Sequence, residues 1–154
     1  MNPKWSSRGA IEVDVFAASR ADFETLVAAV EPLGTIEFTR DLQEWRKPTG
    51  KAEGLAEAVR LFNEERFWEA HEVLEQFWRV ARDEEKRLLQ GLILVCAAFV
   101  HLQKDEQRVA AGLAKRSIPL LAWREPMYHG VRLQELRDSL AAMVEKGALA
   151  FLEI

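Results

Sequence analysis

Apolar and polar positions follow two different patterns along the chain, and the change falls near residue 50. Residues 11–15 and 35–39 alternate between apolar and polar side chains, which predicts two short strands. Residues 19–30 instead place apolar side chains three and four apart behind a serine, a residue type that often caps helix N-termini. We therefore expect a small β-α-β unit within residues 1–47.

A unit with only two strands has unpaired strand edges and is marginally stable alone. Its edges must be covered by the rest of the chain or pair with another copy of it. Pairing of this kind would make the protein a homo-oligomer, most simply a dimer, and we expect that state.

After residue 50 the apolar positions recur every three to four residues, which predicts helices. Five are expected, over residues 52–62, 67–81, 84–102, 106–122 and 132–146. The third is apolar nearly all round and should be the central buried helix, while Pro119 should kink or end the fourth and Gly147 should follow the end of the fifth. The predicted fold is mostly α. It is a compact antiparallel helical domain over residues 51–147 with a small N-terminal β-α-β appendage over residues 1–47.

The composition is that of an ordinary globular domain, with 154 residues, 49% hydrophobic and 30% charged, and a net charge of −4. The sequence lacks the basic stripe that is typical of nucleic-acid-binding proteins. Cys96 lies in an apolar run and should be a small buried hydrophobe. The apolar stretch 88–102 is too short to span a bilayer, and residues 1–5 lack the apolar core of a signal peptide. We therefore expect a cytoplasmic protein that binds neither membrane nor nucleic acid.

One segment places titratable side chains among large aromatic ones at the spacing of a helix. Residues 67–78 carry a histidine and carboxylates between two tryptophans, namely His71, Glu72, Glu75, Trp68 and Trp78. His71 and Glu75 are four apart, so their side chains share one helix face.

The next helix adds Gln90 and His101 as the polar side chains of an apolar stretch, and buried polar groups need partners. Antiparallel pairing of the two helices predicts contacts of Glu75 with Gln90 and of His101 with the loop at residues 63–66.

Three interpretations of this polar cluster stay open. In the first, its members are hydrogen-bonded to one another and fix the helix register. In the second, His71 with Glu75 or Glu72 binds a divalent metal. The His-Glu-x-x-Glu spacing has no second histidine, so a third ligand would have to be His101, His129 or an acid such as Glu69. In the third, His71 and Glu75 act as a metal-free acid–base pair in a pocket walled by tryptophans.

The same residues resemble a known family. The pattern carrying the likeness comprises residues 61–63, 67–75, Trp78, 89–93, 97–102 and 111–113. It is similar to the domain-of-unknown-function family 309, and the likeness covers about residues 55–122 with a further match at residues 130–131. The resemblance implies a compact all-helical domain and no established activity. This chain departs from the family's pattern at residues 117–119, and the N-terminal appendage lies outside it.

The function expected from these observations is a non-catalytic module that binds a small ligand or a protein beside the polar cluster. A looser likeness of residues 67–70 to one tetratricopeptide hairpin is consistent with protein binding. The rival expectation is a metal-dependent, hydrolase-like enzyme that uses His71 and Glu75 as ligands.

Overall fold

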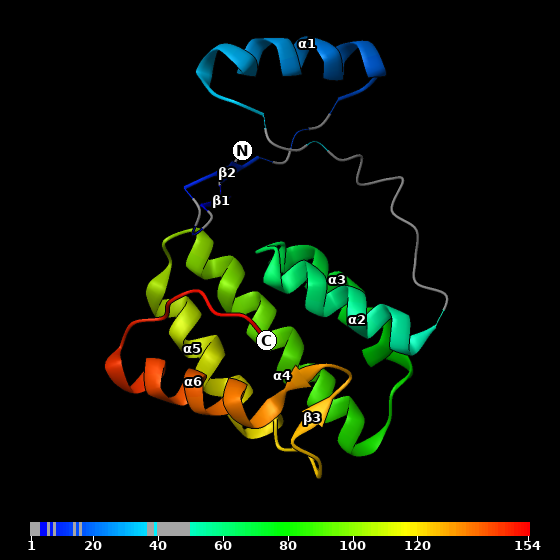
Figure 1. Ribbon diagram of the computed structural model, residues 1–154, viewed down its shortest axis with the longest axis vertical. Coiled ribbons are helices and arrows are strands. Elements are labelled where there is room, and N and C mark those ends of the chain that lie inside the picture. The colour runs from blue at the N-terminus through cyan, green and yellow to red at the C-terminus, as the bar shows by residue number, and fades with distance from the viewer. Residues whose placement is uncertain are drawn as a thin grey trace.

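The computed structural model describes residues 4–5, 7, 9–13, 15, 17–36, 39 and 50–154, and it is mostly helical (Figure 1). The α-helices are α1 (Arg20–Val30), α2 (Lys51–Asn63), α3 (Phe67–Val80), α4 (Asp83–Gln103), α5 (Gln107–Ser117) and α6 (Leu133–Lys146). Short 3-10 turns follow α1 and α5, as η1 (Glu31–Leu33) and η2 (Ile118–Leu120). The strands are β1 (Lys4–Trp5), β2 (Ile11–Glu12), β3 (Met127–Tyr128) and β4 (Val131–Arg132), paired as two antiparallel hairpins.

Helix α4 is the centre of the helical domain, as its apolar sequence predicts. It packs against α3 on one side and α5 on the other, while α2 packs on α3 and α6 on α5 (Figure 1). Twelve of its 21 residues are buried, including Phe99 and Cys96. The predicted burial of Cys96 is thereby confirmed, and none of the described helices is long and apolar enough to cross a membrane.

The connections α2–α3 and α4–α5 are built alike. In each, one non-glycine residue takes a positive φ, 62° at Glu65 and 60° at Asp105. In each, the next amide donates to a carbonyl five residues back, from Arg66 to Leu61 and from Glu106 to His101. This closure satisfies the last carbonyls of the preceding helix and turns the chain back antiparallel.

The boundaries of α2 to α6 agree with the predicted ones to within one residue, except at the end of α5. That helix was expected to reach residue 122, and Pro119 ends it early. The helix stops at Ser117, whose hydroxyl donates to the Ala114 carbonyl at 2.7 Å, and the proline lies in η2. Gly147 follows α6 at φ 72°, in the left-handed region expected of a terminating glycine.

The predicted β-α-β appendage is not shown. Its helix is present as α1, but Ile11–Glu12 pairs antiparallel with β1 rather than with residues 35–39. Of that second predicted strand, Thr35, Ile36 and Thr39 are not in strand conformation, while residues 37 and 38 lie outside the described part of the chain. A second hairpin lies where the sequence predicted a plain loop. It joins β3 and β4 through His129 and Gly130, whose φ angles of 46° and 95° suit the tight turns of two-residue hairpins.

Gln103 is buried at 3% exposure and ties the end of α4 to the α2–α3 turn. Its side-chain Nε2 donates to the Glu65 carbonyl at 2.8 Å. Gln103→Leu should lower the free energy of unfolding by about 1–3 kcal/mol, because the carbonyl is left without that partner. Urea denaturation followed by circular dichroism measures the loss. The exposed Gln134→Leu in α6 is the matched control, and equal values for both variants would contradict the assigned role.

Candidate functional site

Helix α3 presents one buried face and one solvent-facing flank. Its buried residues are Phe67, Ala70, Val73 and Leu74, which point to α2 and α4. At about 100° per residue, Trp68, His71, Glu72 and Glu75 fall beside that face rather than within it. The flank therefore holds four of the seven residues expected to form the site.

Trp68 and His71 stack on each other along this flank. Their rings are parallel within 6° with centroids 5.2 Å apart, and Trp68 remains 50% exposed. The histidine is half-buried, and among the described residues no group hydrogen-bonds to its buried Nδ1 atom. A half-exposed tryptophan laid over a buried, unpaired ring nitrogen is an unusual combination for a purely structural surface.

Burial lowers the pKa of His71, while the charges of Glu75 and Glu72 act in the opposite direction. Burial is the larger effect, so the imidazole is neutral at pH 7. The ring thus offers a nitrogen lone pair rather than a positive charge.

The depressed pKa makes stability depend on pH in a defined direction. Below the ordinary histidine pKa of about 6.5 the unfolded chain binds a proton that folded His71 resists. The free energy of unfolding should therefore fall as pH drops from 7.5 toward 5, and His71→Gln should flatten this fall. Denaturation midpoints at several pH values measure it, with His129→Gln, an exposed loop residue, as control. An unchanged pH slope in the His71 variant would contradict the assignment.

The remaining predicted site residues have other partners. Glu75 pairs with Arg79 on its own helix at 3.1 Å, and the structure describes no bond between Glu75 and the half-buried Gln90. His101 pairs through Nδ1 with Glu106 rather than with the loop at residues 63–66, which Gln103 holds instead. Trp78 lies under the Lys86 ammonium, which is 4.6 Å from the ring centroid.

Two contacts fix the register between α3 and α4. Trp78 meets Lys86, and Phe67 meets Phe99 with ring centroids 5.1 Å apart. His71 therefore lies level with Leu94, far along the axis from His101. The predicted cluster is thus dispersed. Trp68 and His71 stack beside Glu72 and Glu75, Trp78 contacts Lys86, and His101 pairs with Glu106 at the end of α4.

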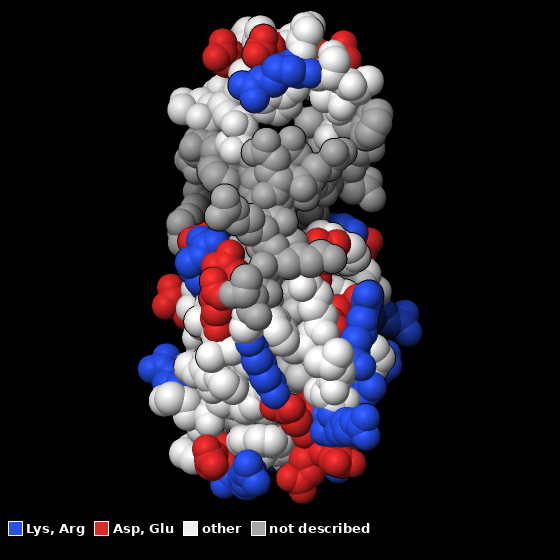
Figure 2. All heavy atoms as spheres, turned by 90° about the vertical axis from the view of Figure 1, so that its right-hand side faces the viewer, with Lys and Arg blue, Asp and Glu red and all other residues white. Residues whose placement is uncertain are grey.

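No group of three or more His, Cys, Asp or Glu side chains suited to a metal ion occurs among the described residues. His71 with Glu75 or Glu72 supplies at most two ligands, as the sequence spacing indicated. Charges of both signs intermingle over the helical part in Figure 2, so this face carries no field of a single sign.

A second polar group was missed by the sequence analysis. The Tyr128 hydroxyl donates to Glu85 at 2.8 Å, and Lys51 forms an ion pair with the same carboxylate. The Lys51 contact is the main cause that lowers the pKa of Glu85, whereas burial raises the pKa of Tyr128. This group fastens the β3–β4 hairpin to the first turns of α2 and α4 through the shared Glu85 carboxylate.

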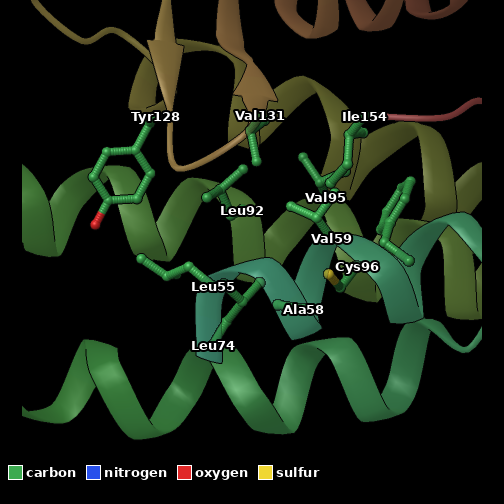
Figure 3. Close-up of a pocket in the computed structure, with 11 residues that line it drawn as sticks. Leu55, Ala58, Val59, Leu74, Leu92, Val95, Cys96, Tyr128, Val131 and Ile154 are labelled. Atoms are coloured by element: carbon green, nitrogen blue, oxygen red, sulfur yellow. The ribbon is translucent and has the colours of Figure 1, made fainter. Parts of the chain in front are cut away.

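An apolar cavity lies beneath the hairpin, lined by side chains of α2, α3 and α4 and by Ile154 (Figure 3). Tyr128 and Val131 border it on the hairpin side, Leu55 and Ala58 border it from α2, and Ile154 closes one end (Figure 3). Its volume of about 10 Å³ is near the least that a single water needs. It is therefore a packing gap and not a site for a ligand as it stands.

Comparison with known proteins agrees with the helical part of this description. An uncharacterized protein of Aquifex aeolicus (strain VF5) is 31% identical to this chain over 91 residues, which cover 58% of this chain and 27% of that protein. The chain thus spans about a quarter of the relative's length. The model of the family described as "Domain of unknown function (DUF309)" matches residues 55–113, which run from α2 into α5. The resemblance predicted from the sequence is therefore confirmed: residues 55–113 of this chain are a match to DUF309.

Proposed function

We propose that the helical domain is a non-catalytic binding module that takes a partner protein on the outer flank of α3, with Trp68 as the central contact. The single observation that supports this most is the Trp68–His71 stack, which leaves half of the indole in solvent. Exposed tryptophans supply a large share of binding energy at protein interfaces. Stacking on His71 fixes the indole before binding, so less side-chain entropy is lost on association.

The chemistry around the stack indicates what the partner offers. The neutral His71 ring adds no positive charge to the flank, and its buried Nδ1 is not accessible to a docking partner. Glu72 and Glu75 border the stack, so a basic or amide-bearing segment is complementary to it. The dimer and the cytoplasmic location expected from the sequence stay predictions.

The test is affinity purification of the tagged protein from cells that express it, followed by binding measurements with the purified candidate partner. Trp68→Ala should weaken that binding at least tenfold, because hot-spot tryptophans often contribute 2 kcal/mol or more. Val109→Ala, on the exposed side of α5, is the matched control and should bind like the wild type. Equal affinities of all three proteins would remove the flank from the binding site.

The rival function, a metal-dependent hydrolase, has one supporting observation, which is the unpaired His71 Nδ1 close to Glu75 and Glu72. Elemental analysis of the purified protein and of His71→Ala separates the two functions. A near-stoichiometric metal that the variant lacks, and that a chelator removes, would favour the hydrolase. A metal-free wild type that binds its partner through Trp68 supports the binding module.

A further inference from the structure

The chain after α6 returns across the helical domain as an extended segment, residues 148–154, which we call the tail. It follows Gly147 and passes α5 and α4 toward α2 and α3, as the red trace in Figure 1 shows. It contains no helix or strand of its own. Its position therefore depends on the hydrogen bonds and apolar contacts that it makes with the helices.

Two side-chain amides form hydrogen bonds with the main chain of the tail. At one end, Leu149 N–H donates to Gln107 Oε1 at 3.3 Å and Gln107 Nε2 donates back to the Leu149 carbonyl at 3.5 Å. At the other end, Ile154 N–H donates to Asn63 Oδ1 at 3.0 Å and Asn63 Nδ2 donates to the Ile154 carbonyl at 3.4 Å. Each amide thus pairs with both main-chain groups of one residue, as a neighbouring strand does, and this mode does not depend on the tail's side chains.

Apolar side chains of the tail fill positions between and beside these amides. Leu149 is buried, and Phe151 lies parallel to Phe67 within 10° at a centroid distance of 5.9 Å. Ile154 closes the cavity of Figure 3. Ala150 and Glu153 point to solvent. Leu152 is partly buried against the core as well. The site therefore accepts apolar residues at the first, third, fourth and sixth positions of an extended hexapeptide.

The tail is held less firmly than the helices it crosses. Three of its four amide contacts are 3.3 Å or longer, and Phe151 and Ile154 are only partly buried. A segment with few buried contacts opens at a lower free energy than the surrounding core. Its departure would uncover Asn63, Phe67, Phe99 and Gln107 as a continuous groove across α2, α3, α4 and α5.

We propose that this groove is a binding site for an extended apolar segment of a partner protein, and that the tail occupies it in cis as a built-in competitor. The chemistry of the partner segment is that of residues 149–154, with main-chain amides at both ends and apolar side chains at the first, third, fourth and sixth positions. Binding in trans requires the tail to leave, so the apparent affinity is reduced by the fraction of molecules with the groove open. This site is separate from the Trp68 flank, and either can fail without the other.

The proposal is tested with a fluorescein-labelled synthetic peptide of residues 147–154 and the full-length protein, by fluorescence anisotropy. Phe151→Ser weakens the competitor and should tighten peptide binding about tenfold relative to wild type. Ile154→Ser weakens the other end of the tail and should also tighten peptide binding. The test therefore remains valid if one of the two variants folds poorly. Glu153→Gln, whose side chain points to solvent, is the matched control and should bind like wild type.

The groove itself is tested by adding Asn63→Ala or Gln107→Ala to the Phe151→Ser variant, which should cancel the gain. A peptide with serine at the position of Phe151 should not bind. Equal affinity in wild type and both tail variants would overturn the proposal, as would an absence of binding in all of them with helix content unchanged. Dimers of the wild type that disappear in Asn63→Ala would also overturn it, because the groove would then hold the tail of a second copy.

Discussion

Replacing Phe99 with alanine is expected to lower the free energy of unfolding by about 3–5 kcal/mol. Phe99 is fully buried on α4 and contacts three other phenylalanine rings. Its ring centroid lies 5.1 Å from Phe62, 5.1 Å from Phe67 and 6.3 Å from Phe151. The alanine would remove the ring that α2, α3 and the tail all contact. Because these three segments cannot all move inward, the resulting cavity can collapse only in part.

Urea denaturation monitored by circular dichroism measures this loss. The exposed Val109→Ala is the control and should change stability by less than about 0.5 kcal/mol. A Phe99→Ala loss below about 1 kcal/mol would mean that the four rings are not the packing centre of the domain.

The second large effect is expected at Gly91, where α4 packs closely against η2. A Cβ atom at this position would lie 3.0 Å from Leu120 Cβ, 3.1 Å from Leu121 Cδ2 and 3.2 Å from the Leu120 carbonyl carbon. Gly91→Val should therefore cost about 1–3 kcal/mol through overpacking, which exceeds the few tenths that valine gains over glycine in helix propensity.

Gly112 on α5 is the matched control for this experiment. It is exposed, and an added Cβ would meet nothing within 4 Å. Gly112→Ala should raise stability by about 0.5–1 kcal/mol, because alanine restricts the unfolded chain and favours the helix. Thermal unfolding of the two variants should move the midpoint in opposite directions, and a stabilised Gly91→Val would refute the close approach.

The helices were predictable because their apolar residues recur at the helical period and their ends carry local signals. Pro119 and Gly147 are such signals, and both lie at helix boundaries in the structure. The side-by-side placement of Trp68 and His71 follows from their spacing of three on one helix. These features depend on neighbours in sequence, which is why sequence reasoning reaches them.

The contacts of His101 were not predictable in the same way. It pairs with Glu106 because the α4–α5 turn, with Asp105 at positive φ, folds that carboxylate back over the last turn of α4. The neighbouring Gln103, rather than His101, then faces the α2–α3 turn. Which of two nearby groups a side chain pairs with depends on the geometry of the turn, and the sequence pattern does not show that geometry.

Partners far apart in sequence left no local signal either. Tyr128 and Glu85 are 43 residues apart, and each is unremarkable in its own segment. The hairpin was missed because strands of two residues are too short to show alternation, although the His129–Gly130 step is a turn signal.

The order of helix contacts has a consequence for how the chain acquires its fold. The strongest packing joins neighbours in sequence, α2 with α3, α3 with α4, and α4 with α5. Contacts of this local kind have a low loop-closure cost, so each helix can dock on the one synthesised just before it. Closing the Ile154–Asn63 contact spans 91 residues, so the tail can seat only after the helices are in place. The groove between the helices is thus formed before the tail fills it.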